Sequence, residues 1–124
     1  MSTLVTKKAD MVVINAKEKK IEAISDHPGL DTLRGIVGGS IAFAHTFENG
    51  DTLYVNDEGL LDDSIDYGFI IEGGHQPFAG NGVIVGQEVE DFENDTYEIK
   101  DAKTKMVTVK FITKKEIYEA LHQY

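Results

Sequence analysis

The sequence predicts a small α+β domain: a mostly antiparallel sheet with a short helix after the first hairpin and a second helix at the C-terminus. Three observations support this fold class. Short β-branched runs alternate with turn residues along most of the chain. Asn49-Gly50 is a dipeptide typical of tight hairpins. Thr113 and Glu116 have the spacing of a helix capping box and precede an apolar helical stripe.

Length and composition favour one folded domain. The chain has 124 residues, and we expect a flexible lead-in at residues 1–9 and a single domain at residues 10–124. Hydrophobic residues make up 41% of the sequence, which is typical of a globular protein. The chain has no cysteine, so it can form neither disulfides nor thiolate zinc sites. Since the sequence shows neither a secretory h-region nor a membrane-spanning apolar run, we expect a soluble, cytoplasmic protein.

The first elements expected are a hairpin and a helix. Residues 11–15 form a β-branched run, and residues 20–24 alternate charged and apolar side chains, which predicts two paired strands around a polar turn. Cap-type residues at 25–28 then precede apolar residues at helical spacing. They predict a helix of about ten residues, which ends at Gly38-Gly39.

A second hairpin is expected around Asn49-Gly50, which predicts a type I′ turn followed by a return strand at residues 52–56. The preceding strand alternates with period two, placing Ile41, Phe43 and His45 on one side and Ala42, Ala44 and Thr46 on the other. Residues 57–59 close the hairpin, and residues 60–67 then predict a short irregular or 3₁₀ segment with its apolar side chains, including Leu60 and Leu61, packed underneath.

The rest of the chain predicts further strands and the final helix. In order, we expect a brief strand at 69–71, a glycine-rich loop at 72–82, a strand at 83–89, an acidic loop at 90–96, the start of a strand at 97–99, a strand at 106–112 and a helix after Thr113.

The charge is unevenly distributed. The net charge is −10, and residues 35–99 contain 14 carboxylates but no Lys or Arg. Such a field repels nucleic acid and anionic lipid and attracts cationic partners. We therefore expect no direct binding to nucleic acid or membranes, and a basic host protein as the partner.

The sequence offers no recognisable catalytic or metal-binding motif. His27, His45, His75 and His122 are far apart and lack metal-ligand spacing, and no nucleophile and base can be paired. The glycines at 80–86 precede a β-branched run, so they do not fit a phosphate-binding loop. The carboxylates at 57–66 do not fit a calcium loop, because Tyr67 occupies the place of the required glycine. We expect a protein that is not an enzyme and has no metal or cofactor.

The acidic interval suggests a functional hypothesis, although a solvated surface that keeps the protein soluble is the simpler interpretation. In the hypothesis, carboxylates form one negative face that mimics a phosphate array and inhibits a basic, nucleic-acid-handling host protein. Glu88 and Glu90 would point the same way on a strand, roughly 7 Å apart. The candidate partner-binding residues are Asp57, Glu58, Asp62, Asp63, Asp66, Glu88, Glu90, Asp91, Glu93 and Asp95.

Two alternatives remain open. One is a small-molecule or nucleotide-binding module that uses the loop at 73–82, with His75, Gln76 and Asn81 as candidate contacts. The other is a purely structural domain. In either case, exposed sheet edges make a homodimer plausible.

The order of several motifs resembles a known family. The motifs are the run at 11–14, Ile36-Val37-Gly38-Gly39, the segment at 53–60 with Asn56-Asp57-Glu58-Gly59, and the glycine-led strand at 81–86. This pattern resembles the phage- and plasmid-associated domain of unknown function 3846 over about residues 10–90, although Asp57 stands where that family commonly has Glu. The resemblance implies an accessory protein of a mobile element and supplies no catalytic residues.

Overall fold

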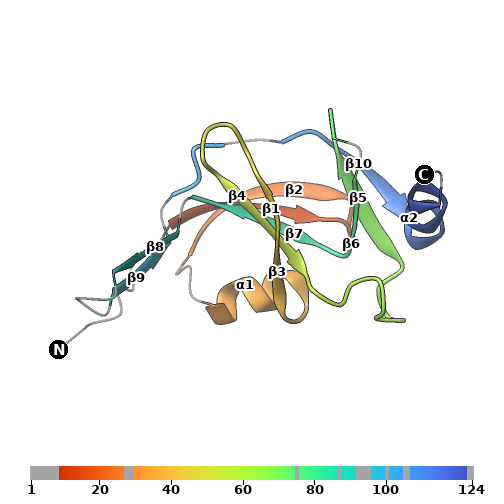
Figure 1. Ribbon diagram of the computed structural model, residues 1–124, viewed down its shortest axis with the longest axis horizontal. Helices are drawn as coiled ribbons and strands as arrows, with labels where there is room; N and C mark the ends of the chain where they lie inside the picture. Colours follow the sequence, from red (N-terminus) through yellow and green to blue (C-terminus); the bar gives the residue numbers. More distant parts are fainter. Residues whose placement is uncertain are drawn as a thin grey trace.

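A computed structural model describes residues 9–26, 30–74, 76–86, 88–91, 96–99, 101–104 and 107–122, with the backbone course alone for 88–91 and 96–99. These residues form two helices and ten strands, all of them paired antiparallel (Figure 1). The predicted α+β fold with a C-terminal helix is therefore confirmed. Of the expected lead-in at residues 1–9, residues 1–8 lie outside the described residues, and Ala9 begins strand β1.

The largest sheet, called sheet A, has five strands in the order β2-β1-β7-β4-β3. They are β1 (Ala9–Asn15), β2 (Lys20–Asp26), β3 (Ile41–Thr46), β4 (Thr52–Asn56) and β7 (Gly82–Val85). Strand β7 is the central strand. Residues Gly82 to Val85 are therefore all buried, as expected for a strand covered on both faces.

Two smaller sheets complete the fold. Sheet B has the order β10-β5-β6 and consists of β5 (Tyr67–Ile71), β6 (Pro77–Ala79) and β10 (Val109–Thr113). Strands β8 (Glu88–Asp91) and β9 (Thr96–Ile99) form a separate two-stranded ribbon. Figure 1 shows this ribbon at one end of the long axis and helix α2 (Lys114–Leu121) at the other.

The layers follow from the alternation of side chains along β1. Met11 and Val13 pack with Leu33 and Val37 of helix α1 (Leu30–Val37), which covers one face of sheet A. Val12 and Ile14 lie on the other face, in a core that includes Phe69 of sheet B. Ile117 of α2 packs against the outer side of sheet B. Burying each such side chain contributes about 1.5–3 kcal/mol.

The β3–β4 hairpin corrects two predictions. The Gly50 N–H donates to the Phe47 carbonyl (3.0 Å), and Gly50 has a positive φ (92°) whereas Asn49 does not. The connection is therefore a turn over residues 47–50 that ends on a left-handed glycine, and the predicted type I′ turn is wrong. A bulge between Phe43 and His45 also breaks the predicted alternation.

The segment after β4 forms successive turns, and the prediction that its leucines pack underneath is wrong. Leu61 is 83% exposed and Leu60 is 37% exposed, whereas Ile65 is buried against sheet B. The Tyr118 hydroxyl donates to the Leu60 carbonyl (3.0 Å) and so holds this segment against α2.

Further along the chain, the predicted boundaries shift. Strand β6 lies inside the predicted loop at 72–82, and the predicted strand at 83–89 divides into β7 and β8, which belong to different sheets. Strand β8 also takes up the start of the predicted acidic loop at 90–96.

The capping box is confirmed: the Glu116 N–H donates to Thr113 Oγ1 (3.2 Å), and the Thr113 N–H donates to Glu116 Oε1 (3.1 Å). Neither helix in the described residues is long and apolar enough to cross a membrane.

Candidate functional site: the groove between β3 and β6

The most distinctive surface feature is a groove between the edge strand of sheet A and the edge strand of sheet B. Two cavities of about 380 and 440 Å³ adjoin there and share Ala44, Gln76 and Phe78 in their walls. The first extends to Glu72 and the second to the turn at Leu60 and Leu61. We call the two cavities together the β3–β6 groove. It exists because β3 and β6 are both terminal strands, which leaves the sandwich open on this flank.

The bulge in β3 decides which side chains reach the groove. Phe43 pairs with Tyr54, which lies on the α1 side of sheet A, whereas His45 pairs with Leu53, which lies on the sheet B side. Residues paired directly across a ladder share a face, so the bulge turns His45 into the first cavity. His45 there packs edge-on against Phe47, with ring centroids 4.8 Å apart.

The groove has an apolar floor and an exposed apolar rim. Ala42, Ala44 and Phe78 form part of the floor. Phe43, at 64% exposed, stands on the rim together with Leu61. Large apolar side chains concentrated beside a cavity are typical of interaction sites, whereas single exposed ones are ordinary.

All the formally charged residues among those described in the groove wall are acidic. Asp57 and Glu58 line the second cavity and Glu72 lines the first. The wall residues that the structure describes include no Lys or Arg, because all of them fall within the cation-free interval 35–99. The groove therefore presents negative charge around an apolar floor.

The structure separates the two halves of the predicted acidic face. Asp57 to Asp66 lie in the connection from β4 to β5, next to sheet B, whereas Glu88, Glu90 and Asp91 lie in β8, at the opposite end of the molecule in Figure 1. Glu93 and Asp95 lie outside the described residues. The described residues thus do not form one continuous acidic face.

In the segment from Asp57 to Asp66, the carboxylates differ in their surroundings. The Asp62 carboxylate accepts hydrogen bonds from the Ser64 hydroxyl (2.6 Å) and the Ser64 N–H (2.9 Å), which lower the pKa of Asp62. Lys114 Nζ donates to the Asp62 carbonyl (2.9 Å) and brings a cation to this end of the segment. Asp57 and Glu58 are exposed and line the second cavity directly.

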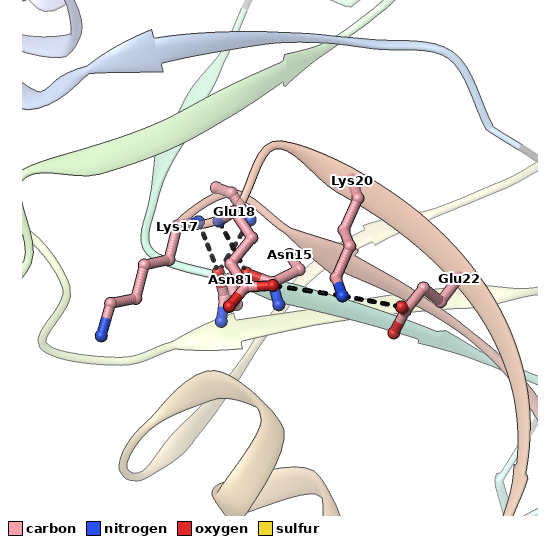
Figure 2. A network of polar contacts seen from close by, with 7 residues as sticks. Asn15, Lys17, Glu18, Lys20, Glu22 and Asn81 are labelled. Carbon is pink, nitrogen blue, oxygen red and sulfur yellow. Dashed lines mark hydrogen bonds and ion pairs between the residues drawn. The ribbon is translucent and has the colours of Figure 1, made fainter.

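The candidate small-molecule contacts of the loop at 73–82 do not all lie at one site. Gln76 lines the groove, and His75 lies outside the described residues. Figure 2 shows Asn81 directed at the turn between β1 and β2, where its side-chain oxygen accepts from the N–H groups of Ala16 (2.8 Å) and Lys17 (3.3 Å). Asn81 therefore has a structural role, beside a turn that Lys20 reinforces through ion pairs with Glu18 and Glu22.

The remaining histidines do not gather. His122 Nδ1 lies 2.6 Å from the Tyr118 carbonyl at the end of α2, remote from His45, and His27 lies outside the described residues. In the described part of the chain, no three His, Asp or Glu residues come close enough together to hold a metal ion.

Sequence reasoning missed the groove itself. Ala42, Ala44 and Phe78 carry no charge and belong to no motif, so only the assembled sheets identify them as a site. One signal was available: residues 41–46 form a strand without Lys, Glu, Asp, Arg or Pro, the residues that commonly protect an exposed edge.

Comparison with known proteins identifies the family to which the chain belongs. A family model described as "Domain of unknown function (DUF3846)" matches residues 9–109. The family resemblance expected from the sequence is therefore confirmed, whereas the association with phages and plasmids stays a prediction. No curated protein and no solved structure matches the chain.

Proposed function

We propose that this chain, which belongs to the DUF3846 family, is a non-enzymatic protein that binds a basic partner protein at the β3–β6 groove. One observation carries the proposal: Asp57, Glu58 and Glu72 surround an apolar floor, and the described wall residues include no Lys or Arg. Apolar contacts supply affinity, and complementary charge supplies orientation and speed of association.

The partner chemistry that fits is a cationic surface with apolar residues among its Lys and Arg side chains. A nucleic-acid-handling protein of the host has such a surface where it contacts phosphates. An acidic protein that occupies that surface would exclude nucleic acid, and this inhibition by phosphate mimicry is the role we assign to an accessory protein of a phage or mobile element. The role needs the carboxylates near the groove, and it does not require those of β8.

A matched pair of charge-reversal variants tests the site. Glu58→Lys combined with Glu72→Lys reverses two groove carboxylates, and Asp31→Lys combined with Glu119→Lys makes the same change in net charge on the two helices. All four positions are exposed, so both double variants are expected to fold. Binding is measured by titration against a basic protein that the tagged full-length chain captures from host lysate and that is then purified.

We expect the groove variant to bind at least about tenfold more weakly, and the helix variant to bind as the wild type does. Binding of the wild type should weaken steeply with salt, and DNA should compete for the partner. Equal weakening in both variants would show that net charge alone acts, and full binding by the groove variant would exclude the groove. Failure of DNA to compete would refute phosphate mimicry and leave partner binding intact.

The first cavity favours a second candidate function, a small-molecule site. Its volume of about 380 Å³ is in the range of ligand pockets, and it combines an apolar wall with His45, Glu72 and Gln76 as polar groups. A thermal-shift panel of nucleotides and metabolites tests it. A hit that raises the melting temperature of the wild type but not of Gln76→Ala would support this function, and a panel without a hit would count against it.

A further inference from the structure

We propose that the partner enters the β3–β6 groove as an extended segment that pairs with the free edge of β3 and alternates Lys or Arg with apolar residues. This inference rests on the proposed function and specifies how the groove would be occupied.

The main chain of β3 is available for pairing. In the described part of the protein, β3 has a strand neighbour on one side only, β4. The Asp57 N–H donates to the Ser40 carbonyl (2.8 Å), so the polar groups of residue 40 face β4. Because these groups alternate along an antiparallel strand, those of Ile41 and Phe43 face away from β4. An added strand would find donors and acceptors there.

The other sheet edges carry features that discourage pairing. Strand β2 contains Lys20, Glu22 and Asp26, β10 contains Lys110, and β6 begins with Pro77, which has no N–H to donate. Strand β3 has neither a formally charged residue nor a proline. Its one irregularity is the bulge, which confines regular pairing to the part from Ile41 to Phe43.

The surroundings of this edge determine the side chains that an added strand should carry. Successive side chains of a strand point to opposite faces, so every second one would enter the groove over Ala42 and Ala44. Small residues on the floor leave room for apolar side chains, and Leu61 extends that apolar surface. The intervening side chains would point to the opposite face of sheet A, away from the groove. Lys or Arg at these exposed positions keeps the segment cationic, which the net charge of −10 on this chain favours.

Charge also distinguishes this occupant from a second copy of the chain. Pairing of β3 with β3 would bring together two molecules that each carry a net charge of −10, and would place two sets of groove carboxylates beside one another. A basic partner segment removes that repulsion and forms ion pairs instead. The edge is therefore better suited to a different, cationic chain than to a homodimer.

The test uses a synthetic peptide of alternating lysine and valine as the probe, together with the full-length chain. Three control peptides replace lysine by glutamate, N-methylate alternate backbone amides, or arrange the lysines and valines in two blocks. Two variants form a matched pair: Phe43→Pro removes the outward N–H and the ring, whereas Phe43→Ala removes only the ring. Affinity is measured by titration, and hydrogen exchange is followed at the amides of β3.

We expect the alternating peptide to bind and to slow exchange at Phe43. Phe43→Pro should bind roughly five- to tenfold more weakly than Phe43→Ala, the cost of losing one main-chain hydrogen bond. N-methylation should abolish binding of the wild type, a result that does not depend on the folding of any variant. The glutamate peptide should not bind.

Four results would overturn the inference. Equal binding of the alternating, block and N-methylated peptides would show that cationic side chains act without strand pairing, and this would leave the proposed function standing. Binding of a compact basic protein but not of the alternating peptide would also exclude strand pairing and leave the proposed function standing. Concentration-dependent protection of β3 in the protein alone would identify a second copy as the occupant. If no cationic probe bound at low salt, both proposals would fail.

Discussion

Asp51 is a buried carboxylate that joins the β3–β4 hairpin to the segment ahead of β10. Its side chain is in a residue only 1% exposed, and it accepts hydrogen bonds from the N–H groups of Lys103 (3.0 Å) and Thr104 (2.7 Å). Burial alone would raise the pKa of Asp51, but the bonds from Thr104, Lys103 and Asn49 outweigh it and lower that pKa. The Asp51 carboxylate thus serves as hydrogen-bond partner for the N–H groups of Lys103 and Thr104 and for the side chains of Thr104 and Asn49.

Asp51→Asn should lower the free energy of unfolding by about 1–3 kcal/mol near neutral pH, because the new amide group faces backbone donors that it cannot satisfy. Asp63→Asn, at an exposed position, should change it little. Urea unfolding followed by circular dichroism measures both. Equal stability of the two variants would show that the buried carboxylate is not needed.

The same carboxylate predicts a pH dependence. Its folded pKa lies below the ordinary value of 3.8, so it adds stability above that value, and this stability is lost as the pH falls through the folded pKa. The difference between the wild type and Asp51→Asn should therefore shrink under acid conditions. Unfolding curves measured across this acid range check it, and a difference that grew on acidification would contradict it.

At the scale of elements, local signals predicted the helices better than the strands. The capping box at Thr113 depends on residues three apart, so the start of α2 could be predicted from the sequence. Strand β6 could not, because Pro77 to Ala79 are extended only where they pair with β5. At Asn49-Gly50 the position of the hairpin was right, but the turn type depended on the register of the whole β3–β4 ladder.

Gly68 shows how closely the elements of sheet B approach one another. A Cβ atom there would meet the main chain of Phe78 and lie 2.6 Å from Ile117 Cδ1, whereas one at Gly35 in α1 would meet nothing within 4 Å. Gly68→Ala should therefore destabilise the protein by about 2 kcal/mol or more. Gly35→Ala should stabilise it by about 0.5–1 kcal/mol, since alanine favours the helix. Thermal unfolding of both variants checks the pair, and a stable Gly68→Ala protein would contradict this packing.

At the scale of the whole molecule, the site could be predicted only in part. The cation-free interval is visible in the sequence and does contribute the groove carboxylates Asp57, Glu58 and Glu72. Which carboxylates act together was not predictable, because β8 departs from sheet A and carries its residues to the opposite end. The groove forms where the edge strands β3 and β6 lie on the same side of the molecule. This arrangement depends on how the two sheets pack, and no single segment of the sequence predicts it.

The central claim is that this open flank is the binding surface, and mapping a bound cationic chain tests it most directly. The measurement is the change in backbone amide chemical shifts when the alternating lysine–valine peptide is titrated into the full-length protein at low salt. We expect the largest changes at Ala42, Phe43, Glu58, Gln76 and Phe78, and only small changes in α1. Changes spread evenly over the acidic surface, or concentrated in β8 and β9, would contradict it.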